Sequence, residues 1–338
     1  MNRIGIICPS EIAFRRFLPA LKEAACFEYA GVAIASKEEF VGATDEILAK
    51  ERAKAQTFVD AYGGKIFEGY SALIHSGEVD AIYLPLPPGL HYKWAKEALG
   101  AGKHILVEKP CTTALANTED LLKDAAQKGL AAHENYMFAF HDQLEVVNEI
   151  VRSGEIGDVR LYRISFGFPM RAQNDFRYNK ALGGGALLDC GGYTLKYASM
   201  LLGPTAKIKY AQSNNINGFG VDMYGSAALV NEDGVTAQIA FGMDHNYKCE
   251  LEVWGSRGTV FTNRILTAPA GFAPEVIIRK GNEEEKRNLP ADDAFKKSIQ
   301  HFCHCIESDN TRRTNYETLL RHARLVEEFK RMANLDEK

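Results

Sequence analysis

The sequence predicts an α/β protein of two domains: an N-terminal doubly wound parallel sheet, then an α+β domain with an open-faced antiparallel sheet. The chain has 338 residues, enough to bury two cores of ordinary domain size. Short apolar runs alternate with amphipathic stretches as far as about residue 135, a pattern typical of a parallel sheet covered on both faces. Beyond about residue 153, strand-like runs follow one another with turns in place of helices. We therefore expect domains at residues 1–125 and 126–338.

The parallel sheet is predicted from five short apolar segments, at residues 4–8, 29–35, 81–84, 104–107 and 130–133. Amphipathic helices are expected between them at residues 44–62, 92–99 and 117–128. A glycine follows each helix, as is common at helix C-termini. Successive β-α units imply right-handed crossovers and a ligand crevice at the carboxyl ends of the strands.

The second domain begins with an expected helix at residues 143–152. Seven strand-like runs follow, at residues 159–166, 208–213, 223–230, 235–241, 249–254, 259–262 and 276–279. The turn "NEDG" at residues 231–234 predicts a hairpin. A glycine-led segment at residues 183–202 is expected to be a loop and then a helix, and helices at 294–307 and 316–332 end the domain. Because helices are expected on only one side of this sheet, its other face predicts a homodimer or homotetramer.

Composition narrows the class of function. The formal net charge is -4 and no long block of like charge occurs, which argues against nucleic acid and membrane surfaces as partners and favours a small polar ligand. No segment has the length of a membrane span or the pattern of a signal peptide, so we expect a cytoplasmic protein. Seven cysteines without a C-x-x-C pair suit a reducing compartment. In "HFCHC", only His301 and Cys305 would share a helix face, and we expect no metal site there.

The opening stretch "IGIICPSEIAFRRFLPAL" predicts a phosphate-binding turn. Cys8, Ser10 and Ala13 stand where a G-x-G-x-x-G/A turn has its small residues, between a strand and a helix. Ser10 can cap the helix and offer its hydroxyl to a phosphate, so we expect a pyrophosphate over Ser10, Glu11 and Ile12. The alternative is an ordinary strand-to-helix turn with a serine cap.

The second predicted strand ends in "IASKEE", which bears on the choice between NAD and NADP. An acidic residue at this place accepts from the ribose of NAD, whereas a hydroxyl and a cation favour the 2′-phosphate of NADP. Ser36 and Lys37 occupy the place, and Arg52 is a candidate second contact. The sequence thus favours NADP, while Glu38 and Glu39 leave NAD open.

Four segments together resemble a known family. They are "IGIICPSEIAFRRFLPAL", "AIYLPLPPGLHYKWAKEALGAGKHILVEKP", "GEIGDVRLYRISFGF" and "FRYNKALGGGALLDCGGYTLKYASMLLG". In order and spacing they resemble the glucose-fructose oxidoreductase and inositol dehydrogenase (Gfo/Idh/MocA) family over nearly the whole chain. The resemblance implies a Rossmann domain, an open-faced sheet domain that often pairs into dimers or tetramers, and NAD(P)-dependent chemistry on a sugar or polyol carbon.

The resemblance also implies roles for individual residues. Lys109 of "EKP" resembles the active-site lysine of the family, with Glu108 and Pro110 beside the nicotinamide. Asp189 and Tyr193 stand where many members have aspartate and histidine. Tyrosine at the second position is similar to a branch that mostly uses NADP and includes glucose-fructose oxidoreductase and some ketosugar reductases.

The segment "LPLPPGLH" resembles the part of the family that contacts the cofactor, so Leu86, Pro87 and His91 are expected there. Pro88 replaces an asparagine that is common in the family. Ala139, in "NYMFAFHD", replaces a frequent arginine, so the substrate contacts usual for that segment are in doubt. Arg177, in the "FR" before the glycines, is expected to contact substrate or nicotinamide.

The chemistry of these residues agrees with such roles. Asp189 and Tyr193 are four apart and would share one helix face. Lys109 follows a strand, at the expected crevice, where its ammonium would favour the tyrosinate and lower the pKa of Tyr193. We therefore expect Tyr193 to carry the proton, Lys109 to tune it, and Asp189 to orient substrate hydroxyls or the lysine.

The expected function is an NADP-dependent oxidoreductase that interconverts an alcohol and a carbonyl on a sugar-like substrate, above all a ketosugar or nucleotide-ketosugar reductase. One alternative is an NADP-dependent aldose 1-dehydrogenase or dihydrodiol dehydrogenase-like enzyme. Another, of a different class, is a non-catalytic dinucleotide sensor. The sequence does not name the sugar, the carbon or the direction.

Overall fold

The computed structural model describes residues 1–40 and 42–335 and divides into two compact units. The first unit contains residues 1–135 and 295–320, and the second contains residues 136–294 and the chain from Arg321 onward. The boundary expected at residue 125 lies inside helix α5 (Leu115–Lys128). The return of residues 295–320 to the first unit was not expected, because an amphipathic pattern shows that a helix buries one face but not which sheet it covers. Residues 336–338 of the expected second domain lie outside the described residues.

The first unit is built on a six-stranded parallel sheet with the order β3-β2-β1-β4-β5-β6. Its strands are β1 (Asn2–Ile7), β2 (Phe27–Ile34), β3 (Lys65–Glu68), β4 (Ala81–Leu84), β5 (His104–Glu108) and β6 (Ala132–Asn135). The five predicted strands are confirmed. Strand β3 was missed because it is a short edge strand in which only Phe67 is buried. The order reverses between β1 and β4, the place where such sheets bind ligands at their carboxyl ends.

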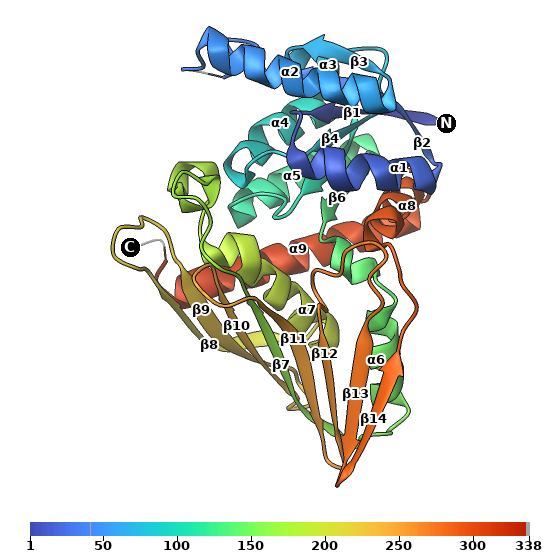
Figure 1. Ribbon diagram of the computed structural model, residues 1–338, viewed down its shortest axis with the longest axis vertical. Helices are drawn as coiled ribbons and strands as arrows, with labels where there is room; N and C mark the ends of the chain where they lie inside the picture. Colours follow the sequence, from blue (N-terminus) through green and yellow to red (C-terminus); the bar gives the residue numbers. More distant parts are fainter. Residues whose placement is uncertain (41, 336–338) are drawn as a thin grey trace. The chain divides into compact units, whose positions relative to one another are not determined.

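Helices cover both faces of this sheet (Figure 1). They are η1 (Ala13–Phe17, a π-helical turn), α1 (Leu18–Ala24), α2 (Asp45–Tyr62), α3 (Tyr70–Ile74), α4 (Pro88–Gly100), α5, α8 (Ala294–Glu307) and the first part of α9 (Asp309–Met332). Helix α2 begins after Thr44, whose hydroxyl accepts from the Ile47 amide at 3.3 Å. Helix α8 packs on this unit through Phe302, whose ring stacks on Phe27 with centroids 5.5 Å apart.

The second unit is built on an eight-stranded sheet with the order β14-β13-β12-β11-β7-β10-β9-β8. Its strands are β7 (Val159–Gly167), β8 (Lys207–Asn214), β9 (Tyr224–Val230), β10 (Thr236–Gly242), β11 (Lys248–Gly255), β12 (Thr259–Asn263), β13 (Glu275–Lys280) and β14 (Glu283–Asn288). The seven predicted strands and the hairpin at residues 231–234 are confirmed. The sheet is antiparallel except that β10 runs parallel to β7, with Ile239 opposite Ile164. Strand β14 was missed because its sequence is entirely polar.

Helices pack on one face of this second sheet. The remaining elements of the unit are η2 (Met137–Phe140), α6 (Gln143–Arg152), η3 (Phe176–Tyr178), η4 (Lys180–Leu182), η5 (Leu187–Gly191), α7 (Gly192–Leu202) and the end of α9. Helix α7 contacts β7 and β10, and Phe329 of α9 lies against Phe241 with ring centroids 5.5 Å apart. The core therefore lies between these helices and the sheet.

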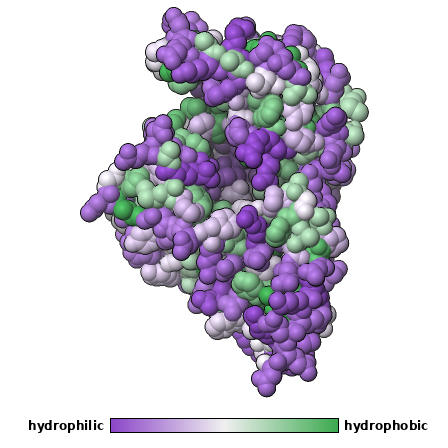
Figure 2. Space-filling model, in the orientation of Figure 1, coloured by the Kyte–Doolittle hydropathy of each residue, from purple (hydrophilic) through white to green (hydrophobic). Residues whose placement is uncertain are grey.

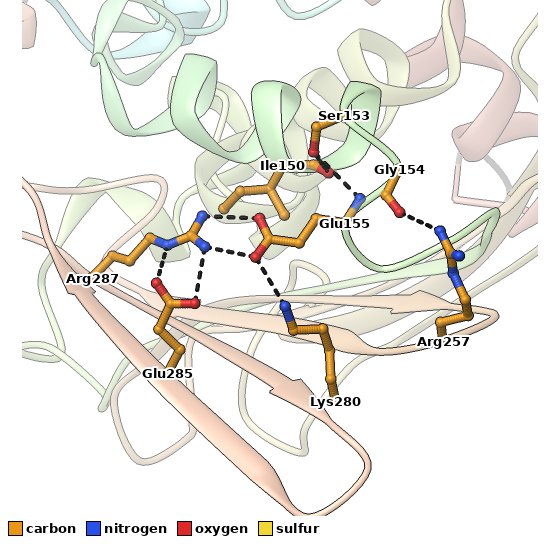
Figure 3. A network of polar contacts seen from close by, with 8 residues as sticks. All are labelled: Ile150, Ser153, Gly154, Glu155, Arg257, Lys280, Glu285 and Arg287. Atoms are coloured by element: carbon orange, nitrogen blue, oxygen red, sulfur yellow. Dashed lines mark hydrogen bonds and ion pairs between the residues drawn. The ribbon is translucent and has the colours of Figure 1, made fainter.

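Charged residues hold the β13–β14 hairpin to the turn before β7 (Figure 3). The guanidinium of Arg287 donates to both oxygens of Glu155, at 3.0 and 2.6 Å, and the Lys280 ammonium donates to one of them at 3.3 Å. The end of the hairpin presents a mainly hydrophilic surface (Figure 2). In residues 1–40 and 42–335, no helix has the length and hydropathy of a membrane span.

Candidate active site

The predicted phosphate turn lies between β1 and η1. Cys8 has a φ of 75°, in the left-handed region that glycine usually occupies. The Ser10 hydroxyl accepts from the Ala13 amide at 3.2 Å, which confirms the predicted helix cap. Glu11 and Ile12 are exposed in the first helical turn. The turn therefore has the backbone of a glycine turn although cysteine occupies its first position.

Burial, and to a lesser extent the nearby carboxylate of Glu51, raises the pKa of the Cys8 thiol to about 12. The thiol is therefore neutral at physiological pH. A neutral, compact side chain places no negative charge beside a phosphate, so this residue fits the role expected for it.

Glu38 and Glu39, at the end of β2, are the acidic residues for which the sequence left NAD as an alternative cofactor. The structure gives these two residues different partners. Both oxygens of Glu39 are engaged by backbone amides: those of Ser36, Tyr70 and Ser71 each donate at 2.8 Å. Burial alone would raise the pKa of Glu39, but these amides outweigh it and hold the pKa below its ordinary value. Glu39 thus ties the end of β2 to α3. Glu38 is exposed and accepts from the Ser36 hydroxyl at 2.9 Å.

The two cations expected near the ribose each have an exposed acidic partner. The Lys37 ammonium lies 3.0 Å from Asp45, and Arg52 is paired with Glu68. Exposed ion pairs of this kind contribute little to stability. A bound phosphate could replace the carboxylate partners at small cost, so both cations fit a 2′-phosphate.

His91 connects the loops that follow β4 and β5. Its ring is fully buried, with Nδ1 2.8 Å from the Pro110 carbonyl oxygen and Nε2 2.7 Å from that of Leu86. Burial lowers the pKa of His91, so the ring is neutral at physiological pH and donates to one carbonyl at a time. Pro87 precedes α4, which begins at Pro88. His91 therefore fixes the loops that contain Leu86 and Pro110 through a ring that is buried in the unit and does not lie at its surface.

Glu108 and Lys109 lie at the carboxyl end of β5. The Glu108 side chain is 7% exposed, and its Oε1 accepts from the Tyr83 hydroxyl and from Asn135 Nδ2, both at 2.7 Å. Burial raises the pKa of Glu108, while these two hydrogen bonds oppose the rise. The Lys109 amide donates to Glu108 Oε2 at 3.4 Å. A buried carboxyl group thus lies next to the backbone of the predicted active-site lysine.

In the second unit, Tyr193 lies in the first turn of α7. Its ring is edge-on to Tyr136, with centroids 4.9 Å apart, and also contacts Phe138 at 5.6 Å and Phe166 at 5.3 Å. The preceding Gly192 is required by this packing, because a Cβ there would lie 2.2 Å from the Tyr136 hydroxyl. An aromatic cage therefore fixes the orientation of the Tyr193 ring.

Asp189 lies in η5, a π-helical turn, whereas the sequence predicted a regular helix through Asp189 and Tyr193. Such turns are frequent at functional sites. Arg177 Nε donates to Asp189 Oδ2 at 2.7 Å, and Arg177 also pairs with Asp175 at 3.1 Å. The predicted substrate contacts Arg177 and Asp189 therefore meet each other, an ion pair that the sequence analysis did not anticipate.

Sequence reasoning missed Asp222, which anchors the start of η5. Its Oδ2 accepts from the Leu187 amide at 2.7 Å and its carbonyl from the Ala186 amide at 2.8 Å. A Cβ at Gly185 would lie 2.2 Å from its Oδ1, so this glycine is needed for close approach. Burial raises the pKa of Asp222 to about 6. No local motif marks the residue, since its partners are more than thirty positions away. Within the described part of the chain, no group of three or more His, Cys, Asp or Glu side chains could hold a metal ion.

Two family models match the chain. Residues 6–136 match "Oxidoreductase family, NAD-binding Rossmann fold", and residues 144–261 match the "GFO/IDH/MocA C-terminal domain". The matches fall on the parallel sheet and on much of the second sheet.

Known proteins match over nearly the full length. The chain is 38% identical to a dTDP-3,4-didehydro-2,6-dideoxy-alpha-D-glucose 3-reductase of Actinomadura kijaniata, covering 96% of this chain and 93% of that protein. It is 39% identical to the reductase of the same name from Streptomyces violaceoruber, covering 98% and 96%. A crystal structure of a 3-ketoreductase from Actinomadura kijaniata with NADP and TDP-benzene has a TM-score of 0.89 at 38% identity, covering 98% and 97%. Variants of that ketoreductase with one tyrosine or one lysine replaced are similar at 36–37% identity, with TM-scores of 0.86–0.89 and coverage of 98% and 97%.

Proposed function

Because the chain belongs to the Gfo/Idh/MocA family of oxidoreductases, we propose that it is an NADP-dependent reductase that converts a carbonyl of a nucleotide-linked ketosugar into an alcohol. The observation that carries this proposal is the similarity to dTDP-sugar 3-reductases over both units. The sensor alternative loses support because both the lysine and the tyrosine expected for catalysis are present, in ordered surroundings.

The cofactor contacts in this proposal come from the first unit. Ser10, Glu11 and Ile12 would hold the pyrophosphate, and Ser36, Lys37 and Arg52 would bind the 2′-phosphate. The occupation of Glu39 by three backbone amides supports NADP, because it leaves that carboxylate engaged elsewhere. When bound, the reduced cofactor supplies the hydride.

The protein supplies the proton and the charge. As the carbonyl carbon gains the hydride, Tyr193 donates its hydroxyl proton to the carbonyl oxygen and is left as tyrosinate, which recovers a proton from solvent. The Lys109 ammonium stabilises negative charge on that oxygen and on the tyrosinate. Asp189, fixed by Arg177, orients the substrate. The mechanism requires Lys109 and Tyr193 to act on one substrate, which a crystal structure with NADP and a substrate analogue would test.

Activity is tested with a panel of free and nucleotide-linked ketosugars, followed by nicotinamide absorbance with NADPH and NADH. Tyr193→Phe keeps the ring and removes one oxygen, so turnover should fall ~100-fold to ~10,000-fold while cofactor binding is retained. Lys109→Ala should lose at least as much. Tyr197→Phe is the matched control, because Tyr197 is in the same helix and its buried hydroxyl has no hydrogen-bond partner in the structure.

Near-normal turnover of Tyr193→Phe on a confirmed substrate would contradict the mechanism and direct attention to His91 and His141. Oxidation of free aldoses with NADP⁺, without reduction of any ketosugar, would favour the aldose 1-dehydrogenase alternative.

The proposal also includes assembly into a homo-oligomer and a location in the cytoplasm. Seven free cysteines support a reducing location, which cell fractionation can check.

A further inference from the structure

A chain of buried hydrogen bonds within the first unit leads from α8 to Glu108. His133 Nε2 lies 3.0 Å from the Ser298 hydroxyl, which donates to Asn135 Oδ1 at 2.8 Å. Asn135 Nδ2 in turn donates to Glu108 Oε1 at 2.7 Å. Two strands and one helix, β5, β6 and α8, therefore meet at the residue that precedes Lys109.

Between His133 Nε2 and Glu108, the hydrogen bonds run in one direction. The Ser298 hydroxyl has a single proton and gives it to Asn135, so the bond between His133 and Ser298 must have His133 Nε2 as its donor. On the far side, His133 Nδ1 lies 3.0 Å from Asn315 Oδ1, which only accepts, so a hydrogen bond there would have Nδ1 donating away from Glu108. Asn315 is itself fixed by donating to the Ala132 carbonyl at 2.7 Å. Every donor from His133 Nε2 onward points toward Glu108.

The residues of this hydrogen-bond chain are buried, so the chain is not a surface feature. The exposed fraction is 3% for His133, 0% for Ser298, 1% for Asn135 and 7% for Glu108. Replacing such polar groups with apolar residues is often neutral or favourable for stability, so stability alone does not explain them. A row of donors aimed at a buried carboxyl group has a direct electrostatic effect: it favours the ionised form.

We propose, on the premise that Lys109 acts in catalysis as described above, that Ser298 and His133 are positioning residues whose aligned donors hold Glu108 as a carboxylate next to Lys109. The carboxylate accepts from the Lys109 amide and supplies a fixed negative charge next to the lysine in sequence. The charge holds the ammonium in place when the carbonyl oxygen becomes negative.

The titratable groups around this chain come from three strands and one helix. Tyr83 of β4 donates to Glu108, and Lys109, directly after β5, acts on it through its charge. His133 belongs to β6, and the ring of His301 in α8 lies 5.3 Å from it. Loss of the Ser298 donor should raise the pKa of Glu108, because burial already favours the neutral form. The acidic limb of the pH profile of kcat should therefore move to higher pH.

The test compares Ser298→Ala with Cys305→Ala, each of which removes one heteroatom from a buried side chain of α8. Ser298→Ala should lower kcat at neutral pH by roughly tenfold, the lower end expected for losing a hydrogen bond in a chain that ends on a charge. KM for NADPH should change little, and the acidic limb should shift. Cys305→Ala should keep the wild-type profile, and Ser298→Thr, which restores the hydroxyl, should recover it. His133→Phe should shift the limb in the same direction.

A second readout uses the protein without cofactor. Infrared titration should show the band of a protonated carboxyl group appearing at higher pH in Ser298→Ala than in the wild type, and Glu108→Gln should remove that band. An identical band position and kcat profile in Ser298→Ala and wild type would overturn this proposal, even if Lys109→Ala is inactive. If Lys109→Ala instead keeps full turnover, the proposed function fails. The infrared shift in Ser298→Ala still tests whether the hydrogen-bond chain controls the protonation of Glu108.

Discussion

We expect single side chains at the end of β2 to determine which cofactor the first unit binds. Ser36 and Lys37 stand where an acidic residue would contact the ribose of NAD, and the half-buried carboxylate of Glu39 is bound to backbone amides. Cofactor preference should therefore depend on a few exposed groups that can be changed without disturbing the sheet.

The first prediction follows from Lys37. Lys37→Ala should weaken NADPH binding by about tenfold and leave NADH binding nearly unchanged, because only NADPH has the phosphate that the ammonium would bind. Titration by intrinsic fluorescence measures both constants. Lys50→Ala is the control, since Lys50 is also exposed and paired, with Glu46 at 2.7 Å. Tighter binding of NADH than NADPH by the wild type would contradict the argument from Ser36 and Lys37.

Residue-level roles could be predicted from sequence where the contacts are local. The cap by Ser10 depends on an amide three positions away, and the spacing revealed it. The role of Glu39 depends on amides 31 and 32 positions away, and that of Ser298 on residues more than 160 positions away. Lys109, Asp189 and Tyr193 were chosen through a family resemblance, and their roles remain proposals.

At the scale of elements, prediction succeeded where burial is strong and periodic. All four residues of β4 are buried, and its predicted limits match those of the structure. Strands β3 and β14 are edge strands with few or no buried residues, so neither gives an apolar pattern. The π-helical turn η5 was also missed, because it depends on the distant Asp222 for its first amides.

Asp222 gives a second prediction, at the start of η5. The pKa of Asp222 in the folded protein, about 6, lies above its ordinary value. The contribution of this group to the free energy of unfolding is therefore fully present at low pH, and it is lost as pH rises through about 6. The wild type should lose roughly 2–3 kcal/mol from this group between pH 4 and pH 8. Asp222→Asn cannot ionise and should show a flatter dependence. Urea unfolding at several pH values measures it, and parallel curves for the two proteins would contradict the assignment.

The β13–β14 hairpin supports a third prediction. The hydrogen bond from Arg287 holds the pKa of Glu155 below its usual range, so its stabilising contribution is present at neutral pH and disappears as pH falls through the lowered value. Glu155→Gln should lower the free energy of unfolding at pH 7 by about 1 kcal/mol, and the difference should vanish in acid. Glu145→Gln, which breaks the exposed pair with Arg152, is the control and should have no measurable effect. Equal effects of the two changes would show that the Glu155 network adds nothing to an ordinary surface pair.

At the scale of the whole molecule, the chain enters the second unit at residue 136, returns to the first for residues 295–320 and ends in the second. The order of the elements could be predicted from sequence, because it follows the pattern of apolar runs. The return of residues 295–320 to the first unit could not be predicted from sequence. It is determined by contacts such as that of Phe302 with Phe27, two residues that are far apart along the chain.

The second sheet leads to the last prediction. Helices α7 and α9 pack on one face, while the outward residues Tyr210, Tyr224 and Trp254 remain 53%, 39% and 41% exposed. A hollow of about 320 Å³ near the ends of β9 and β10, lined in part by outward-facing Ser226 and Ala240, offers space for side chains of a second copy. We therefore expect at least a dimer, formed through this face.

Light scattering at micromolar concentration should give at least twice the mass of one chain. Trp254→Glu should shift the protein toward monomer, because it replaces a large exposed aromatic side chain of the expected interface with a charge. Phe40→Glu makes the same kind of change at an exposed aromatic residue of the first unit and should leave the mass unchanged. Neither residue is among those we expect to contact the cofactor, so both variants should still bind NADPH. A clean monomer for the wild type would refute assembly altogether, whereas a dimer that tolerates Trp254→Glu would move the interface to another surface.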